Sequence, residues 1–263
     1  MISPESKPFL SIVIPAYNEA RRIPSSLESV SRFISSRNFP VEVIVVDDGS
    51  SDAMPALLTE AAARWPGLRV LRNESNRGKG YSVRRGFLEA RGVFVLLADA
   101  DLSTQIEEAD RLLSELETSQ ADAAIGSRAL RRDLIGVHQP LLREWGGRFF
   151  NVLVRALTGL DLRDTQCGFK LFRGETARRA FELQRAQGFG FDPEVLFLIQ
   201  RSGGKILEVP VHWNDDPDTR VRFARDSARM MGELVALRWR ALTGKYDPPG
   251  QPRNSAPRER ATR

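Results

Sequence analysis

Residues 10–48 read LSIVIPAYNEARRIPSSLESVSRFISSRNFPVEVIVVDD, and this stretch decides the fold class. Two apolar, β-branched runs, Leu10–Ala16 and Val41–Asp48, enclose the segment Ala20–Arg37, where apolar residues recur at helical spacing. Both runs are almost continuously apolar, which is typical of parallel strands that are covered on both faces. The stretch therefore predicts a strand–helix–strand unit of a parallel sheet.

The same alternation continues along the chain. Further strands are predicted at Leu68–Asn73, Gly92–Asp101, Ala121–Arg128, Gly168–Phe172 and Lys205–Val211. Further helices are predicted at Asp52–Arg64, Lys79–Ala90, Ile106–Thr118, Pro140–Leu157, Gly174–Arg185, Pro193–Ser202 and Val221–Leu242. This pattern predicts an α/β fold with a doubly wound, Rossmann-like, mostly parallel sheet flanked by helices.

The composition is that of an ordinary globular protein. The 263 residues are 41% hydrophobic and 28% charged, which excludes collagen-like, low-complexity and wholly disordered classes. One cysteine, Cys167, excludes an intramolecular disulfide, and two histidines are too few for a three-histidine zinc site. Any catalytic metal must therefore depend on oxygen ligands. No run of 18 apolar residues and no secretory signal pattern occurs, so we expect a cytoplasmic location.

The net charge of +5 is concentrated late in the chain. Arg128–Arg155 and Arg220–Arg240 each contain six arginines and two acidic residues, and Gly244–Arg263 contains five basic and two acidic residues. The rest of the chain is consequently acidic. A nucleic-acid binder is disfavoured by that acidic remainder and by the acids at strand ends, and we expect no nucleic-acid partner.

Acidic residues follow several of the predicted strands, and in a doubly wound sheet ligands bind at the carboxyl ends of the strands. The first strand leads into Pro15–Glu19 and the second into Asp47–Asp52. Carboxylates followed by Gly and Ser suit hydrogen bonds to a ribose or a base, although turn and cap roles explain one such strand equally well. The fourth strand ends in Asp99 and Asp101, which strand alternation would point the same way, about 7 Å apart. Two hard anionic ligands suit Mg²⁺ or Mn²⁺, which would also hold a diphosphate.

Two common nucleotide motifs are missing. The turn after the first strand contains no glycine, so a dinucleotide-binding site is disfavoured. The segment Asn76–Gly80 resembles a phosphate-binding loop, but Asn73 occupies the position where a Walker A motif requires its first glycine.

Seven segments, in this order, resemble glycosyltransferase family 2 with the GT-A fold. They are SIVIPAYNEARRI, VEVIVVDDGSSD, NRGKGYSVRRG, LLADADLST, AIGSR, DTQCGFKLFR and EVPVHW. Within the family they are similar to the polyprenyl and dolichyl-phosphate glycosyltransferases, and DADLST with DTQCGFKLF favours the glucosyl branch over the mannosyl branch. The resemblance implies an inverting, metal-dependent transfer of glucose from UDP-glucose to a polyprenyl phosphate, with a β-linked product.

The resemblance also implies a domain organisation. It covers one GT-A domain, residues 9–243, with a nucleotide-binding half (9–128) and an acceptor-binding half (129–243). Residues 1–8 are expected to be flexible. Residues 244–263 are expected to form a disordered basic tail, because they are rich in Pro and Arg and contain almost nothing to bury.

Site residues follow from the resemblance by position. The list is Pro15, Tyr17, Glu19 and Asp48 for uridine, Lys79 for the nucleotide end, Asp99 and Asp101 for the nucleotide and the metal, and Arg128, Arg143, Arg148 and Arg220 for the acceptor. Asp101 and Arg128 are the expected catalytic residues. The mannosyl enzymes have a further Gln ligand where this chain has Ser103 or Thr104, and Arg220 stands in a loop that departs from the family's pattern at three positions.

A polyprenyl phosphate lies in a bilayer, so we expect the protein to bind peripherally to the cytoplasmic face of the membrane. One predicted helix carries an apolar stripe bordered by arginines, which is typical of a helix lying in the interface. This stripe is Leu141, Leu142, Trp145, Phe149, Val152 and Leu153. A second stripe, Phe223, Met230, Leu234 and Trp239, is expected to face the core instead. A separate membrane partner protein, a donor such as GDP-mannose, and a non-catalytic nucleotide-sugar-binding module all stay open at this point.

Overall fold

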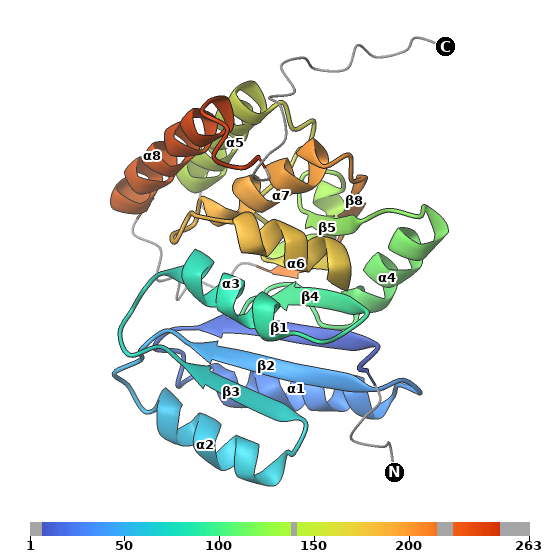
Figure 1. Ribbon diagram of the computed structural model, residues 1–263. Helices are drawn as coiled ribbons and strands as arrows, with labels where there is room; N and C mark the ends of the chain where they lie inside the picture. Colours follow the sequence, from blue (N-terminus) through green and yellow to red (C-terminus); the bar gives the residue numbers. More distant parts are fainter. Residues whose placement is uncertain (1–6, 138–140, 215–222, 248–263) are drawn as a thin grey trace.

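The structure, a computed structural model, describes residues 7–137, 141–214 and 223–247 (Figure 1). For residues 132, 137, 141–145, 148–149 and 223–227 it describes the backbone alone. None of the helices in these ranges is both long and apolar enough to cross a membrane.

A seven-stranded sheet forms the centre of the molecule, in the order β3-β2-β1-β4-β7-β5-β8. Its strands are β1 (Leu10–Ala16), β2 (Val41–Asp47), β3 (Leu68–Arg72), β4 (Phe94–Ala98), β5 (Ala123–Ser127), β7 (Phe169–Arg173) and β8 (Ile206–Pro210). Neighbouring strands are parallel except at β7, which runs antiparallel to both β4 and β5. The predicted α/β fold with a mostly parallel sheet is confirmed.

Helices cover both faces of this sheet (Figure 1). They are α1 (Ile23–Ser35), α2 (Met54–Arg64), α3 (Lys79–Glu89), α4 (Glu108–Thr118), α5 (Leu141–Thr158), α6 (Gly174–Leu183), α7 (Phe191–Arg201) and α8 (Phe223–Leu242). One hydrophobic core lies under α1, α2 and α4, and a second lies under α3 and α5–α8.

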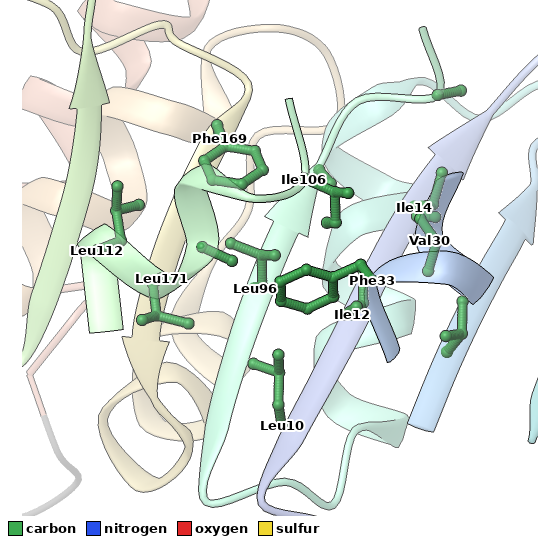
Figure 2. Close-up of a cluster of buried hydrophobic side chains, with 14 of the residues drawn as sticks. Leu10, Ile12, Ile14, Val30, Phe33, Leu96, Ile106, Leu112, Phe169 and Leu171 are labelled. Atoms are coloured by element: carbon green, nitrogen blue, oxygen red, sulfur yellow. The ribbon is translucent and has the colours of Figure 1, made fainter. Parts of the chain in front are cut away.

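The two cores explain why the strands are apolar throughout. Ile12 and Ile14 enter the first core, which Figure 2 shows, while Val13 between them enters the second. The same alternation occurs along β2 and β4, because successive side chains of a strand point to opposite faces. Each strand therefore needs apolar residues at every position.

A second, two-stranded sheet was not predicted from the sequence. It pairs β6 (Ile135–Val137) with β9 (Trp213–Asn214), and a short 3₁₀ turn, Arg132–Leu134, precedes it. Its strands are too short to leave a periodic pattern in the sequence. The sheet fixes Trp213 close to the segment that follows β5.

The end of β4 differs from its prediction. The sequence predicts a strand that continues to Asp101, but β4 ends at Ala98. The backbone turns at this point, since the Leu102 N–H donates to the Asp99 carbonyl over 3.1 Å and Leu102 has a φ of 48°. Asp99 and Asp101 therefore lie in a turn, and the predicted strand alternation of their carboxylates is wrong.

The ends of the domain also differ from expectation. The Val93 N–H donates to the Pro8 carbonyl, so order begins within the segment expected to be flexible. After α8, residues 244–247 continue in an ordered turn, and Tyr246 is only 3% exposed. The Tyr246 hydroxyl donates to the buried carboxylate of Glu194, which gives this part of the expected tail something to bury. The rest of that tail, 248–263, and residues 1–6 lie outside the described residues.

Candidate active site

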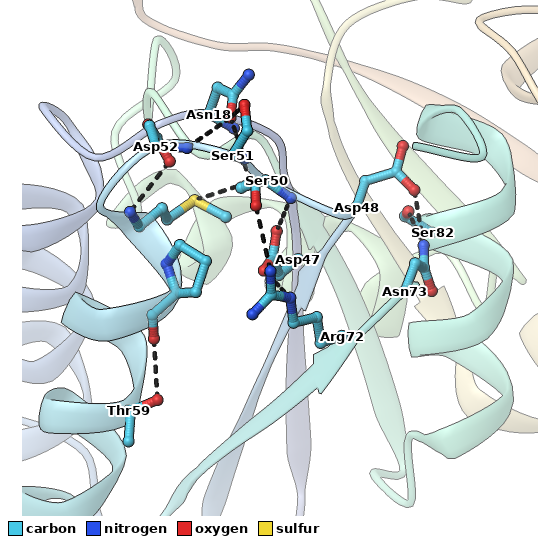
Figure 3. A network of polar contacts seen from close by, with 12 residues as sticks. Asn18, Asp47, Asp48, Ser50, Ser51, Asp52, Thr59, Arg72, Asn73 and Ser82 are labelled. Atoms are coloured by element: carbon cyan, nitrogen blue, oxygen red, sulfur yellow. Dashed lines mark hydrogen bonds and ion pairs between the residues drawn. The ribbon is translucent and has the colours of Figure 1, made fainter. Parts of the chain in front are cut away.

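The loops that follow β1 and β2 are joined side by side at the carboxyl edge of the sheet (Figure 3). The Asn18 N–H donates to the Ser50 hydroxyl, and the Asn18 side-chain oxygen accepts from the Ser51 N–H, each over 2.8 Å. The Ala20 N–H donates to the carboxylate of Asp52 over 3.0 Å. Asn18 has a φ of 55°, a left-handed conformation that Asn tolerates better than most residues. These hydrogen bonds join the two loops into one structural unit.

Three of the residues assigned to uridine lie at the end of β1 and along the loop that follows it. Pro15 is buried within β1, opposite Val46 of β2. Tyr17 follows the strand and is 38% exposed, so its ring is accessible to a ligand. The Glu19 carboxylate accepts two hydrogen bonds from the Arg22 guanidinium, over 2.6 and 3.0 Å.

Asp48, the fourth residue assigned to uridine, is 4% exposed and organises the loop before α3. Its carboxylate accepts hydrogen bonds from the Asn73 side chain (2.7 Å), the Arg77 N–H (3.0 Å) and the Gly78 N–H (2.8 Å). Figure 3 shows the contact between Asp48 and Asn73. This supporting role was not predicted from the sequence.

Lys79 begins α3 and reaches across to the end of β4. Its ammonium lies 2.6 Å from an Asp99 carboxylate oxygen. Burial lowers the pKa of Lys79, but Asp99 and Asp192 raise it more, so the net direction is upward and the ammonium is held in its charged form. The Asp99 carboxylate also packs directly on Gly168, where a Cβ atom would overlap its Oδ2 atom. The glycine before β7 is therefore part of the site.

Asp101 lies in the same turn as Asp99. Its carboxylate accepts a hydrogen bond from the Ser103 N–H over 2.9 Å. Burial and the neighbouring Asp99 both raise the pKa of Asp101, because two close carboxylates disfavour each other's charged form. A cation stabilises such a pair of carboxylates, and the Lys79 ammonium already forms an ion pair with Asp99.

The donor set at this turn fits a hard divalent cation. Within residues 7–137, 141–214 and 223–247, no three His, Cys, Asp or Glu side chains gather into a possible metal cage. Asp99 and Asp101 would supply two carboxylate ligands, and a bound diphosphate and water would supply the rest. Mg²⁺ and Mn²⁺ favour such oxygen ligands, and Mg²⁺ in particular is usually bound by one or two carboxylates together with substrate phosphates.

Arg128 follows β5 and forms a two-point ion pair with Asp164. Its Nε and Nη2 atoms donate to the two Asp164 oxygens over 2.7 and 2.8 Å, and its backbone N–H donates to the same carboxylate. Burial raises the pKa of Asp164, but Arg128 lowers it more, to about 2. The pKa of Arg128 is raised in turn, with contributions from both Asp164 and Asp99. Asp164 thus holds the guanidinium at the carboxyl end of β5, the same sheet edge at which β4 ends.

Further residues support this ion pair. The Arg163 and Asp164 N–H groups donate to the two oxygens of Glu208 over 2.8 and 2.9 Å. The Trp213 ring lies 5.4 Å from the Arg128 guanidinium carbon. These partners were not predicted, although Asp164 opens the DTQCGFKLFR segment that carries the family resemblance.

A buried ion pair lies beneath both sides of the site. Lys170, on β7 between β4 and β5, is 1% exposed, and its ammonium is 2.5 Å from the buried Asp192 carboxylate at the start of α7. Burial raises the pKa of Asp192, while Lys170 and Lys79 oppose that shift. The pair therefore connects β7, whose preceding Gly168 packs on Asp99, to the start of α7, which packs against α3. No pattern in the sequence indicates that these two residues meet.

The remaining acceptor candidates are not tested by these contacts. Arg143 and Arg148 lie on α5, but their side chains are outside the described part of the chain. Arg220 lies outside the described residues altogether.

The outward face of α8 differs from its prediction. Leu234 is buried, as expected, but Trp239 is 64% exposed. Val235 and Leu242 lie on the same stripe as Trp239 and are 57% and 64% exposed. Trp239 is exposed because the core-facing positions of α8 are Leu234 and Leu237, which lie on the opposite side of the helix. On α5, Val152 is likewise 61% exposed, and the side chains of Leu141, Leu142, Trp145 and Phe149 are outside the described part.

Comparison with known proteins gives consistent results. Residues 11–181 match the family model of Glycosyl transferase family 2. Dolichyl-phosphate beta-glucosyltransferase of Dictyostelium discoideum is 35% identical over 248 residues, which cover 90% of this chain and 76% of that protein. The proteins of the same name from Drosophila melanogaster and Saccharomyces cerevisiae are 39% and 34% identical, with the same two coverages.

Solved structures resemble the fold. Glucosyl-3-phosphoglycerate synthase from Mycobacterium tuberculosis in complex with UDP has a TM-score of 0.64 at 22% identity, covering 88% of this chain and 80% of that one. The same enzyme with Mn²⁺, UDP-glucose and phosphoglyceric acid has a TM-score of 0.60 at 21% identity and the same coverages. The GT-A fold expected from the sequence is confirmed.

Proposed function

The chain belongs to glycosyl transferase family 2, and on that premise we propose that it transfers glucose from UDP-glucose to a polyprenyl phosphate of the dolichyl type. One observation carries the proposal: two carboxylates that follow β4, with a lysine at the start of α3, lie at the same edge of the sheet as Arg128, which follows β5 and which Asp164 holds in place. The first cluster suits a cation-bound diphosphate, and the second suits an anionic acceptor. The names of the relatives, at 34–39% identity over about nine-tenths of the chain, support glucose and a dolichyl-type phosphate as the pair.

On the donor side, Asp99 and Asp101 would hold Mg²⁺ or Mn²⁺ together with the diphosphate. When bound, this cation neutralises charge on the departing UDP. Lys79 adds a second positive charge next to Asp99. Tyr17 and Asp48 would lie along the uridine, because they belong to the loops after β1 and β2, which hydrogen bonds join to each other.

On the acceptor side, Arg128 would hold the phosphate. A guanidinium has five N–H donors in a planar fork, of which Asp164 engages two, so the remaining donors can bind phosphate oxygens. A phosphate monoester has a second pKa near 6 and is already an anionic nucleophile at pH 7, so the reaction needs no general base.

The chemistry is then a single displacement. A phosphate oxygen attacks C1 of glucose, the bond between C1 and the diphosphate oxygen breaks, and UDP leaves with that electron pair. Attack from the face opposite UDP inverts C1, so an α-linked donor gives a β-linked glucosyl phospholipid. The protein's contribution is to hold two anions in line, which proximity makes effective.

Transfer of a radiolabel to lipid tests this proposal. The chain is incubated with UDP-[¹⁴C]glucose or GDP-[¹⁴C]mannose, a short polyprenyl phosphate and Mn²⁺, and label in the lipid extract is counted. We expect label from UDP-glucose and none above background from GDP-mannose. Label from GDP-mannose alone would show that the donor is GDP-mannose and not UDP-glucose. UDP binding without transfer from either donor would contradict the proposal that the protein is an enzyme.

We further propose that the protein meets its acceptor by docking on an anionic membrane surface through α8. The exposed stripe Val235, Trp239 and Leu242 supports this, since Arg229 and Arg238, both exposed, flank it on either side. An apolar stripe between basic residues suits a bilayer interface, where each basic residue near an anionic leaflet adds about 1 kcal/mol.

Vesicle co-sedimentation tests the docking surface. On vesicles of phosphatidylcholine with anionic phosphatidylglycerol, the double variant Val235→Ser/Trp239→Ser should bind about tenfold more weakly than wild type. Val93→Ser, which changes an exposed apolar residue before β4, is the matched control and should bind as wild type. Equal binding of the double variant and wild type would contradict this docking surface. If wild type instead proved to be a dimer in solution and the double variant a monomer, the stripe would be the contact with a second copy of the chain.

A further inference from the structure

The segment between α6 and α7, residues 184–190, packs against the start of α3. Its carbonyl groups face the glycines on either side of Lys79. The Gln187 carbonyl accepts a hydrogen bond from the Tyr81 N–H over 3.2 Å, and a Cβ atom added to Gly78 would overlap the same carbonyl oxygen. A Cβ atom on Gly80 would lie 2.6 Å from the Ala186 carbonyl oxygen. The backbone around Lys79 therefore rests directly on this segment.

The same segment reaches the Lys79 side chain. The Phe189 ring centroid lies 6.0 Å from the Lys79 ammonium, which is paired with Asp99. A shift of this segment would consequently move both the backbone that carries Lys79 and the ring beside its ammonium.

The N–H groups of the segment face the other way, toward two carboxylates. One oxygen of Glu194, on α7, accepts from the Arg185 and Ala186 N–H groups over 2.9 and 2.6 Å. The two oxygens of Glu233, on α8, accept from the Gly188 and Gly190 N–H groups over 2.8 Å each. Figure 1 shows the α6–α7 connection between α8 and the start of α3. The segment is thus fixed to α7 through Glu194 and to α8 through Glu233.

We propose that Glu233 is a positioning residue for the nucleotide-sugar donor, acting through residues 187–190 on Lys79. A carboxylate is suited to this task because it accepts from two N–H groups at once, and hydrogen bonds to a charged group are stronger than neutral ones. A glutamine would keep the size but accept from only one of the two N–H groups and place its own NH₂ against the other. The inference rests on the proposed use of Lys79 and Asp99 to bind the donor diphosphate.

Glu208 provides a matched control for the experiment. It also accepts from two backbone N–H groups, those of Arg163 and Asp164, over 2.8 and 2.9 Å, but it lies behind Arg128 on the acceptor side. Glu233→Gln and Glu208→Gln therefore remove the same kind of support from opposite sides of the site. Each variant is compared with wild type for the Kd of UDP with Mn²⁺ by calorimetry, for KM of UDP-glucose and of polyprenyl phosphate, and for Tm.

We expect Glu233→Gln to raise the Kd of UDP and the KM of UDP-glucose about tenfold, with the acceptor KM within about twofold of wild type. Glu208→Gln should instead raise the KM of polyprenyl phosphate and leave the Kd of UDP and the KM of UDP-glucose near wild type. The loss of Tm should be similar in the two variants. A Kd of UDP within about twofold of wild type in Glu233→Gln, or equal rises in both KM values, would overturn the proposal.

The calorimetric arm separates this inference from the proposed function. If wild type binds UDP but transfers no glucose, the proposed reaction fails, while the Kd of Glu233→Gln still decides the positioning role. If wild type binds no UDP, both the donor site and the role of Glu233 are refuted.

Discussion

At the end of β4, two carboxylates stand together, whereas at the end of β5 a guanidinium stands against a carboxylate. The donor side has two carboxylates against the single ammonium of Lys79, and burial together with the neighbouring Asp99 raises the pKa of Asp101. On the acceptor side, Arg128 lowers the pKa of Asp164 to about 2, and the pair is neutral as a whole. The carboxylate side therefore suits the binding of a metal cation. On the arginine side, the Arg128 guanidinium already provides the positive charge.

The difference accounts for how one site could hold two anions at once. Under the proposed assignment, a diphosphate on the carboxylate side would need a metal ion to cancel the repulsion, while a phosphate on the arginine side would bind the guanidinium directly. Asp164 also fixes the plane of the guanidinium, because it engages both the Nε and Nη2 atoms. Changes to either side should consequently affect one substrate and spare the other.

The largest effect is expected for Asp101→Asn. The amide keeps an oxygen for the Ser103 N–H but cannot carry the charge that a divalent cation requires. Glucose transfer to polyprenyl phosphate should fall about 10³-fold, measured as label in the lipid extract. The control is Asp161→Asn, an exposed acid paired with Arg155 outside the site, which should keep wild-type activity. Retention of more than about a tenth of the activity in Asp101→Asn would contradict the metal role.

A smaller loss on the same side is expected for Gly168→Ala. The added methyl would overlap the Asp99 carboxylate and displace it, while the backbone of β7 keeps its place. A displacement of about 1 Å in a catalytic group can cost about 10²-fold, so kcat/KM for UDP-glucose should fall by that factor with little change in Tm. Gly232→Ala, where the methyl meets no neighbour, is the matched variant and should bind UDP as wild type. Equal UDP-glucose kinetics in the two variants would show that Asp99 needs no fixed position.

On the acceptor side, Arg128→Lys should have a still smaller effect. A lysine keeps the charge next to Asp164 but loses the planar fork that binds a carboxylate and a phosphate together. The KM for polyprenyl phosphate should rise roughly tenfold, with the KM for UDP-glucose unchanged. Steady-state kinetics with each substrate varied in turn measures both values. A rise confined to the KM for UDP-glucose would reverse the assignment of the two sides.

The smallest effect is a change of stability with pH. The pKa of Asp164 is lowered from 3.8 to about 2 by Arg128, so its contribution is fully present above pH 3.8 and is lost as the pH falls toward 2. The contribution is about 2 kcal/mol in the free energy of unfolding. Urea unfolding of wild type and Asp164→Asn should therefore give a difference that shrinks by about this amount between pH 6 and pH 2.5. A difference that stays constant over this range would mean that the ion pair does not depress the pKa of Asp164.

The sequence predicted the local structure around Asp99 and Asp101 better than that around Arg128, and the reason is physical. Strand β1 was predicted to the residue, because a strand between two cores has to be apolar at every position. Asp99 and Asp101 follow such a strand directly, so their place at the sheet edge was also predictable. The turn that contains them was not, because it depends on the left-handed backbone of Leu102, which leaves no periodic signal.

The contacts of the acceptor side depend on residues far apart in the chain. Arg128 and Asp164 are 36 positions apart, and Lys170 and Asp192 are 22 apart, so no local pattern pairs them. The exposure of Trp239 depends on which face of α8 packs against the second core, and both of its faces carry apolar residues. Local patterns predict elements, but long-range pairing of charges has to be seen in the fold.

The division of the site into two sides is tested most directly by the affinity of UDP. The Kd of UDP in the presence of Mn²⁺ is measured by calorimetry for wild type, Asp101→Asn and Arg128→Lys. If the carboxylate side binds the donor and the arginine side binds the acceptor, Asp101→Asn weakens UDP binding at least about 100-fold, while Arg128→Lys stays within about threefold of wild type. Equal weakening in both variants, or tight UDP binding by Asp101→Asn, would contradict it.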